Sequence, residues 1–347
     1  MFDHPSFDQH ERVVFAHDAA TGLHAIVAIH STARGPGAGG CRFWQYDSTE
    51  AALADVLRLS RGMSYKNAMA GLPLGGAKAV VMIDASRPKT PRMLEAFGRF
   101  VDSLQGQYIT AEDVGASVAD MEIVATQTSY VSGLPRTAVA SDGNPSPKTA
   151  LGVYLGIKAA VKFKLGGEDL RGVTVAVQGL GGVGYELCRL LAADGVRLRV
   201  ADIRPEVAQK AANEFDAIVC PPEQILFERV DVLAPCALGG LLNADTIPRL
   251  QASIVAGAAN NQLATAEDGA RLHAAGVLYA PDYVINAGGI ISVGREYLGG
   301  ATAESITAEI HRIPGRLTEI FARSSADNRP TSELADEMAR QLLLEAR

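Results

Sequence analysis

Two lysines in the first part of the chain lie among residues that are mostly small or apolar. Lys66 lies in the stretch RGMSYKNAMAG, and Lys78 lies in GLPLGGAKAVV, between glycines and an apolar run. A lysine on a solvated face usually has charged neighbours, so we expect both side chains to be partly buried. Burial, or a second cation nearby, lowers the pKa of a lysine and makes its amine available as a base.

A carboxylate completes this group of residues. Asp113 lies in YITAEDVGAS, directly after a stretch that is expected to form a strand. Taken singly, each of the three residues is equally well explained as a surface lysine or as an aspartate that caps a turn. Residue types and spacing alone therefore leave a catalytic role and a structural role open.

A glycine loop in the second half has the spacing of a dinucleotide-binding motif. Gly179, Gly181 and Gly184 form G-x-G-x-x-G between the apolar run VTVAV (173–177) and the helical pattern YELCRLLAADG. The first glycine allows a tight turn, the second a close approach to a pyrophosphate, and the third close packing of helix on strand. The amides of the helix N-terminus then face the phosphates. A purely structural glycine turn is the alternative.

The next apolar run, VRLRVAD (196–202), ends on Asp202. A carboxylate at this position accepts hydrogen bonds from the ribose hydroxyls of the adenosine and repels a 2′-phosphate. The motif therefore favours NAD over NADP. Arg204 could instead face a 2′-phosphate, although a solvated residue at the start of a helix is the simpler interpretation.

Length and composition exclude several classes of protein. The chain has 347 residues, 48% of them hydrophobic and 20% charged, which suggests about two globular domains. The net charge of −7 does not favour nucleic acid or an anionic membrane as a partner. No apolar run of about 18 residues and no signal-peptide pattern is present. The cysteines lack the spacing of a metal site and are expected to be free thiols of the cytoplasm: Cys41, Cys188, Cys220 and Cys236.

Strands and helices alternate along the chain, which predicts an α/β fold with a parallel sheet and helices on both faces. Helices are expected at 47–63, with Asp47 as N-cap and Glu50 three residues later, from Thr90–Pro91 onward, and at 148–163. The cluster SDGNPSP (141–147) is a candidate domain boundary. The last ~40 residues are expected to be helical. Further strands are expected at 23–30, 79–83, 217–219, 231–234, 253–256 and 277–280.

Several longer stretches resemble one enzyme family along almost the whole chain. The resemblance is to the Glu/Leu/Phe/Val amino acid dehydrogenases, and closest to their leucine dehydrogenase branch. It implies an N-terminal α/β substrate and oligomerisation domain (1–140, with 327–347 returning to it), a Rossmann-type doubly wound domain (141–326), and a cleft between them. The matching stretches are GPGAGGCR (35–42), RGMSYKNA (61–68), LPLGGAKAVV (72–81), YITAEDVG (108–115), GNPSPKTALGVY (143–154), VAVQGLGGVG (175–184), APCALGG (234–240), GAANNQL (257–263) and APDYVINAGG (280–289).

The resemblance also implies roles for particular residues. Lys66 matches the lysine that binds the substrate carboxylate, Lys78 matches the catalytic lysine, and Asp113 matches the second catalytic group. Gly40 and the amide of Asn260 are implied to orient the substrate. Alignment with leucine dehydrogenases gives an apolar pocket for the substrate side chain, formed by Ala38, Ala111, Ile290 and Val293.

On the cofactor side, the resemblance implies NAD and no metal. Cys236 is expected to be structural, since no base is paired with it in the sequence. Asn260 is shared between the substrate and the cofactor. The residues implied to line the nucleotide site are Thr149, Gly179, Leu180, Gly181, Gly182, Val183, Gly184, Asp202, Ile203, Cys236, Ala237 and Asn260.

The implied activity is the reversible, NAD-dependent oxidative deamination of an apolar L-amino acid to a 2-oxo acid and ammonia. Leucine, valine and isoleucine are the expected substrates, and a phenylalanine or broad aromatic amino acid dehydrogenase is the alternative. A catalytically silent NAD-binding protein would lack Lys66, Lys78 or Asp113, and all three are present. The resemblance also implies a cytoplasmic homo-oligomer without nucleic-acid or membrane partners.

Overall fold

The chain folds into two compact units, each described here by itself. The computed structural model describes residues 2–134, 144–167 and 169–346. One unit comprises Met1–Asn144, Val293–Thr302 and Ala339–Arg347, and the other comprises Pro145–Ser292 and Ala303–Met338. Part of the stretch expected to be the domain boundary, 141–143, lies outside the described residues. The sequence did not predict that Val293–Thr302 belongs to the first unit.

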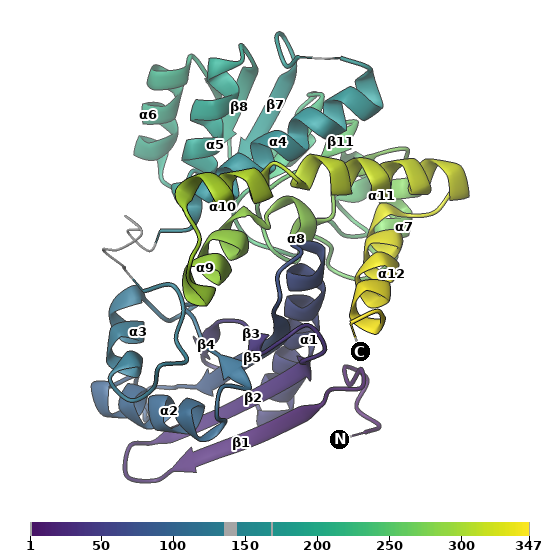
Figure 1. Ribbon diagram of the computed structural model, residues 1–347. Coiled ribbons are helices and arrows are strands. Elements are labelled where there is room, and N and C mark those ends of the chain that lie inside the picture. The colour runs from purple at the N-terminus through teal and green to yellow at the C-terminus, as the bar shows by residue number, and fades with distance from the viewer. Residues whose placement is uncertain (1, 135–143, 168, 347) are drawn as a thin grey trace. The chain divides into compact units, whose positions relative to one another are not determined.

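The first unit is built on a mixed sheet in the order β1-β2-β5-β3-β6, with β4 also paired to β5 (Figure 1). β1 runs antiparallel to β2, and β2 antiparallel to β5, whereas β3, β4 and β6 run parallel to their neighbours. The strands are β1 (Arg12–Asp18), β2 (Leu23–Ser31), β3 (Gly37–Ala38), β4 (Cys41–Trp44), β5 (Gly75–Met82) and β6 (Tyr108–Ile109). The helices are α1 (Thr49–Met69), α2 (Pro91–Ser103) and α3 (Val118–Ala125). The edge strand β1 was not predicted, because its half-exposed residues show no clean alternation.

The N-cap of helix α1 lies one residue later than the sequence indicated, and the helix ends at Met69, six residues beyond the expected end at 63. The side chain of Ser48, and not that of Asp47, accepts the hydrogen bond from the backbone N–H of Ala51, so Ser48 is the N-cap. Ser48 is as strong a cap as aspartate, and the helix starts where its hydroxyl reaches the free amide. For α2 the prediction is confirmed: Thr90 caps the helix and Pro91 occupies its first turn.

The alternation of side chains along β5 divides the core of this unit into two layers. Ala77, Ala79 and Val81 face the layer formed by α2 and α3. Val80 faces the opposite layer, which is formed by the apolar stripe of α1. Lys78 lies two residues before Val80 and therefore points to the α1 side of the sheet.

The second unit is a six-stranded, wholly parallel sheet in the order β12-β11-β10-β7-β8-β9, which confirms the predicted doubly wound fold (Figure 1). Its strands are β7 (Thr174–Gln178), β8 (Arg197–Ala201), β9 (Ile218–Val219), β10 (Val232–Pro235), β11 (Ile254–Val255) and β12 (Leu278–Tyr279). Every predicted strand of this half forms within one or two residues of its expected bounds. Buried parallel strands read as continuous apolar runs, which is why they were recognisable.

Helices α4 and α5 pack together and contact the sheet, and α11 packs on α4. The other face is covered by α7 and the 3₁₀ helices η2 and η3 over one apolar cluster. None of the helices in the described residues is long and apolar enough to cross a membrane. The helices that begin in this part of the chain are α4 (Ser146–Leu165), α5 (Gly182–Ala193), α6 (Pro205–Phe215), η2 (Ile225–Phe227), η3 (Ile247–Arg249), α7 (Glu267–Ala274), α8 (Asp282–Ile285), α9 (Gly288–Leu298), α10 (Ala303–Ile310), α11 (Ile313–Asp327) and α12 (Thr331–Leu344).

Candidate functional site

The first unit brings Lys78 and Asp113 into direct contact. Nζ of Lys78 lies 3.1 Å from Oδ2 of Asp113. Lys78 is only 6% exposed, although it is a lysine in the interior of a strand. A buried ammonium is tolerated where a carboxylate compensates its charge, so the pair is a built feature and not a chance surface contact.

The strand register explains how residues distant in sequence meet here. β4 pairs Cys41 with Ala79, and the bridge between Cys41 and Glu112 continues the ladder on the other side. Gly40 therefore lies between Lys78 and Ala111. A Cβ at Gly40 would lie 2.4 Å from the carbonyl oxygen of Glu112, so this position requires glycine. Glycine here allows the chain to approach itself, which places three predicted substrate-site residues side by side.

Asp113 carries its negative charge between two cations. Arg42 Nε lies 3.0 Å from the same Oδ2 that Lys78 approaches. Burial alone would raise the pKa of Asp113, but the charges and hydrogen bonds of Lys78 and Arg42 outweigh it and lower the pKa. Asp113 is therefore ionised at neutral pH and can accept a proton.

Arg42 belongs to a network that the sequence analysis missed. Its Nη1 donates to Oδ2 of Asp55 at 3.0 Å, and the hydroxyl of Tyr46 donates to the same oxygen at 2.6 Å. The signal in the sequence was a charged residue inside CRFW, the short strand that follows the glycine pair. A charged side chain in a strand that is otherwise mostly buried needs a partner, and that partner lies on α1.

Lys66 lies in the last turn of α1 and is half-buried. The next residue, Asn67, fixes this end of the helix to the sheet by donating to the carbonyl oxygen of Gly75 at 2.6 Å. A Cβ at Gly76 would lie 2.0 Å from the backbone nitrogen of Ser64, so α1 packs directly on β5 here. Lys66 and Lys78 therefore lie on the same side of the sheet.

Ala38 and Val293 also belong to the first unit. Ala38 is buried in β3, and its carbonyl oxygen accepts from Asn67 at 3.4 Å. Val293 contacts the position of Gly133, where an added Cβ would lie 3.8 Å from its Cγ1. Ile290 lies one turn earlier on the same helix, α9, but on the other side of the division between the units.

In the second unit, the three motif glycines have different surroundings. A Cβ at Gly184 would lie 1.9 Å from the carbonyl oxygen of Gly179, and one at Gly179 would lie 2.7 Å from Cβ of Ala237. Gly184 is required by the packing of α5 against the turn after β7, and Gly179 by its φ of +90° and by the segment that contains Ala237. A Cβ at Gly181, the N-cap of α5, would meet nothing within 4 Å. The space at the helix N-terminus therefore fits the close approach of a phosphate group.

Asp202 follows β8 and orders this loop. One oxygen accepts from the backbone N–H of Leu180 at 2.7 Å, and the other from Nε of Arg204 at 3.1 Å. Burial alone would raise the pKa of Asp202, but the hydrogen bonds from Arg204 and Leu180 outweigh it and lower the pKa. Ile203, the next residue, is 88% exposed. An ionised carboxylate beside an exposed apolar side chain fits the ribose and adenine of a nucleotide.

The other predicted cofactor residues lie around the same edge of the parallel sheet. Thr149, in the first turn of α4, borders the start of α9, since a Cβ at Gly289 would lie 2.5 Å from its Oγ1. Cys236 directly follows β10, and burial raises the pKa of its thiol to about 12, which agrees with a structural role. Asn260 accepts from the side-chain nitrogen of Asn286 at 2.9 Å. Gly182 and Val183 form the first turn of α5.

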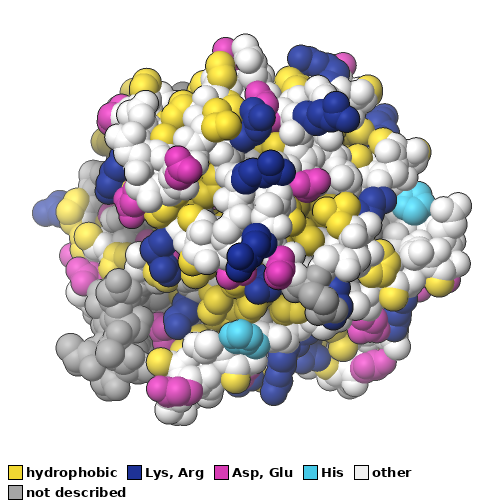
Figure 2. All heavy atoms as spheres, turned by 90° about the horizontal axis from the view of Figure 1, so that it is seen from above, with side chains coloured by type: hydrophobic (Ala, Val, Ile, Leu, Met, Phe, Trp, Pro, Cys, Tyr) yellow, Lys and Arg dark blue, Asp and Glu magenta, His cyan; other side chains and the backbone are white. Residues whose placement is uncertain are grey.

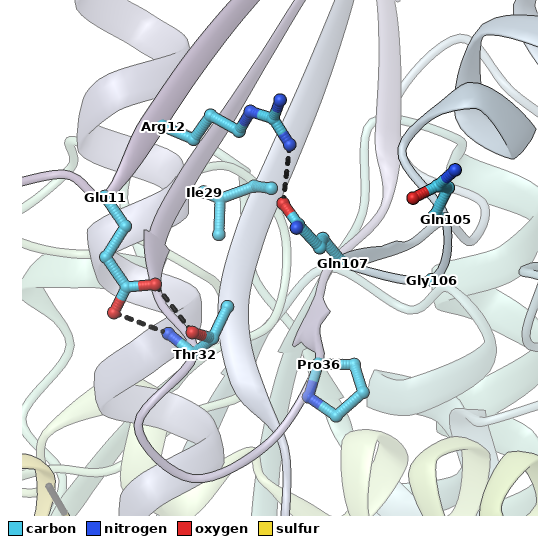
Figure 3. Close-up of a pocket in the computed structure, with 8 residues that line it drawn as sticks. All are labelled: Glu11, Arg12, Ile29, Thr32, Pro36, Gln105, Gly106 and Gln107. Carbon is cyan, nitrogen blue, oxygen red and sulfur yellow. Dashed lines mark hydrogen bonds between the residues drawn. The ribbon is translucent and has the colours of Figure 1, made fainter.

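A separate surface hollow of about 650 Å³ lies in the first unit (Figure 3). It contains none of the predicted site residues, and four of its polar side chains already hydrogen-bond to one another. Glu11 accepts two hydrogen bonds from Thr32, and Arg12 donates to Gln107 at 2.7 Å. We therefore assign the chemistry to the Lys78–Asp113 pair and not to this hollow.

Among residues 2–134, 144–167 and 169–346, no group of three or more His, Cys, Asp or Glu side chains has the geometry of a metal site. On the face shown in Figure 2, Lys and Arg side chains are interspersed with Asp and Glu. This face therefore presents no basic patch of the kind that binds nucleic acid.

Two domain models of one enzyme family match this chain, one in its N-terminal part and one in its C-terminal part. Residues 10–130 match the dimerisation domain of the Glu/Leu/Phe/Val dehydrogenases, and residues 198–327 match the Glutamate/Leucine/Phenylalanine/Valine dehydrogenase domain. Leucine dehydrogenase of Geobacillus stearothermophilus is 49% identical over 98% of this chain and 92% of its own length. Valine dehydrogenase of Streptomyces coelicolor is 46% identical over 97% of this chain and 93% of its own length.

A solved structure extends the likeness to the fold. The crystal structure of L-tryptophan dehydrogenase from Nostoc punctiforme matches with a TM-score of 0.86 and 44% identity, over 97% of each chain. Because both domains match and the relatives are this similar over nearly the whole length, the chain belongs to the glutamate/leucine/phenylalanine/valine dehydrogenase family.

Proposed function

We propose that the chain catalyses the NAD-dependent oxidative deamination of an apolar L-amino acid, with leucine, valine and isoleucine as preferred substrates. The reaction converts the amino acid, NAD⁺ and water to a 2-oxo acid, ammonium, NADH and a proton, and it is reversible. The observation that carries the proposal is the buried Lys78–Asp113 pair at 3.1 Å, beside a position that only glycine can occupy.

The proposed roles follow from the chemistry of an amino acid zwitterion. Lys66 supplies the cation for the carboxylate, and Asp113 supplies an ionised acceptor for a proton of the amino group. Loss of hydride from the α-carbon leaves a cationic imine, to which water must add. Once its ammonium has given up a proton to bulk water, the neutral amine of Lys78 takes the proton of the attacking water, and Asp113 moves protons to and from the departing amine.

The second unit supplies the cofactor site. We propose that the helix N-terminus at Gly181 binds the pyrophosphate and that Asp202 binds the adenosine ribose, which selects NAD. Bound NAD supplies the hydride acceptor. Thr149, Ala237 and Asn260 line the same site in this proposal, and Ile203 contacts the adenine.

The residues proposed to contact the substrate side chain are all apolar: Ala38, Ala111, Ile290 and Val293. A charged substrate side chain would lose its hydration there without gaining a partner, so glutamate, aspartate and lysine are excluded as substrates. Relatives of this chain carry the names leucine, valine and L-tryptophan dehydrogenase. We therefore expect discrimination among apolar amino acids to be graded, since one methylene changes it by about 1–3 kcal/mol.

The test is turnover with a panel of amino acids, followed by the near-ultraviolet absorbance of reduced nicotinamide. We expect activity with leucine, valine and isoleucine, and none with glutamate. A kcat/KM for phenylalanine or tryptophan well above that for leucine would assign the chain to the aromatic alternative. Absence of turnover with every aliphatic and aromatic amino acid would refute the proposal.

The role of Lys78 is tested with Lys78→Ala and a matched control. Lys158 forms an ion pair of similar length, 3.0 Å, with Asp194 in the second unit. We expect Lys78→Ala to abolish turnover while NAD still binds, and Lys158→Ala to leave turnover unchanged. Near-normal turnover of Lys78→Ala would refute its assignment as the base.

We further propose that the protein acts as a homo-oligomer in the cytoplasm. The match of residues 10–130 to a dimerisation domain supports self-association. All four cysteines are free, which suits a reducing compartment. Light scattering on the purified protein tests the first point, since a monomeric mass at micromolar concentration would contradict it.

A further inference from the structure

The carboxylate of Asp113 is held by a second cation that the proposed reaction does not use. Arg42 Nε and Lys78 Nζ both approach Oδ2, at 3.0 and 3.1 Å. Within the described part of the chain, no hydrogen bond reaches Oδ1 of Asp113. Two cations on one oxygen fix the rotation of the carboxylate and leave the other oxygen to meet a ligand.

The guanidinium of Arg42 is itself fixed from α1 and from the loop before it. Arg42 Nη1 donates to Oδ2 of Asp55 at 3.0 Å, and Tyr46 donates to that oxygen at 2.6 Å. Burial and the hydrogen bond to Asp55 raise the pKa of Tyr46, so its hydroxyl stays protonated and remains a donor. The planar fork of arginine presents two nitrogens in fixed geometry to the two carboxylates, whereas lysine has a single nitrogen on a flexible chain.

We propose that Arg42, braced by Asp55 and Tyr46, is a positioning residue that fixes the direction and the charge of the Asp113 carboxylate for the substrate amino group. The inference rests on the proposed function, in which Asp113 moves protons to and from that group. Arg42 acts through Asp113 and Asp55 and is not itself placed against the substrate, so it is not a catalytic residue.

The surroundings of Asp113 show why the second cation matters. Lys78 and Arg42 together compensate Asp113 and Asp55. Removal of Arg42 would leave two carboxylates against one ammonium, and like charges favour protonation. Burial and the charge of Asp113 already raise the pKa of Glu112. Burial also raises the pKa of Cys41 and of Tyr108, so both of these side chains stay neutral. The titratable and charged groups around Asp113 are Lys78, Arg42, Glu112, Cys41, Tyr108, Tyr46 and Asp55.

The experiment uses Arg42→Gln with two readouts, the pH dependence of kcat/KM for leucine and an isotope-edited NMR titration of the Asp113 carboxyl. We expect the acid limb of the profile and the carboxyl titration to move together to higher pH. We expect kcat to fall by about 10- to 100-fold, because a misplaced reacting group has a cost of this order. The Kd of NAD should stay unchanged, since its proposed site lies in the other unit.

Two further variants separate charge from geometry. Arg42→Lys keeps the charge but loses the fixed two-nitrogen geometry that orients both carboxylates, so the acid limb should return toward that of the wild type while kcat stays low. Tyr46→Phe removes only the hydrogen bond from Tyr46 to Asp55. It should shift the acid limb and lower kcat in the same direction as Arg42→Gln, but by less. Its matched control is Tyr154→Phe, which removes a Tyr–Asp hydrogen bond of the same length, 2.6 Å, to Asp194 in the second unit and should change neither readout.

The outcomes keep this inference apart from the proposed function. If the wild type oxidises no amino acid, the proposed function fails, whereas the NMR titration still tests Arg42. A folded Arg42→Gln variant whose Asp113 titration and kcat equal those of the wild type overturns the inference. If Arg42→Gln does not fold, Tyr46→Phe decides in the same way: no difference from Tyr154→Phe overturns it.

Discussion

His10 and His30 meet edge to face in the first unit, with ring centroids 4.9 Å apart. Both are buried, at 7% and 8% exposure. Burial lowers the pKa of His30 to about 4, helped by the neighbouring His10, and burial also lowers the pKa of His10. His10 bonds to the carbonyl of Leu57 and to Ser60, and His30 bonds to Ser64, so the pair joins the N-terminal segment and β2 to α1.

This pair predicts that the first unit is sensitive to acid. A histidine whose pKa is lowered by folding stabilises fully above its unfolded pKa of about 6.5, and this contribution is lost as the pH falls toward about 4, because the unfolded chain binds the proton first. We expect the free energy of unfolding to fall by on the order of 2–3 kcal/mol across this window. Urea unfolding between about pH 7 and about pH 4 measures it.

The control for this prediction is a histidine on the surface. His30→Gln removes the titrating group and should flatten the pH dependence, whatever it does to stability at neutral pH. His311→Gln changes an exposed residue and should keep the slope of the wild type. Equal slopes for the wild type and His30→Gln would contradict the prediction.

Asp202 predicts the cofactor preference. Asp202→Asn keeps an acceptor for the backbone N–H of Leu180 but removes the charge that repels a 2′-phosphate. We expect the ratio of kcat/KM for NADP to that for NAD to rise about tenfold or more, which corresponds to about 1.4 kcal/mol. Arg204→Gln, which removes the partner of Asp202, should not raise this ratio. Unchanged cofactor preference in Asp202→Asn would show that the ribose is bound elsewhere.

Substitution of Gly181 by alanine is predicted to weaken the binding of NAD without lowering the stability of the fold. A Cβ there meets no protein atom within 4 Å, so Gly181→Ala should fold normally, yet the added carbon occupies the space proposed for the pyrophosphate. We expect the Kd of NAD to rise about tenfold or more with an unchanged Tm. Gly315→Ala, in a position equally open, serves as the control and should leave the Kd unchanged. Calorimetric titration with NAD measures both variants.

The strands of the second unit could all be predicted from the sequence, whereas in the first unit the bounds of only β2 and part of β5 were predicted. Buried parallel strands such as β7 and β10 are continuous apolar runs, and local pattern is sufficient to find them. β3 and β6 are two residues long, and β1 is a half-exposed edge strand. Their pairing is set by tertiary register and by glycines that allow close approach, which periodicity does not record.

The candidate site shows the same division. Lys78 and Asp113 stood out by residue type and by resemblance, and the structure adds that they touch. Arg42, Tyr46 and Asp55 were missed, because a bridge between a strand and a helix is a tertiary contact with no fixed spacing. Gly40 and Gly76 bring the chain close to itself, and Gly181 is the one of the three motif glycines that opens to free space.

The close packing at Gly40 predicts that the positions of Lys78 and Asp113 depend on the backbone at this residue. A Cβ at this position would lie 2.4 Å from the carbonyl oxygen of Glu112 and 2.9 Å from Cβ of Asp113. Gly40→Ala must push the Asp113 segment away from β5, and we expect kcat to fall about a hundredfold or more. Gly62→Ala, where a Cβ meets nothing within 4 Å on α1, should keep full activity. Because backbone opposes backbone at Gly40, no side-chain rotation relieves the clash, and wild-type turnover in Gly40→Ala would show that Asp113 does not act from this position.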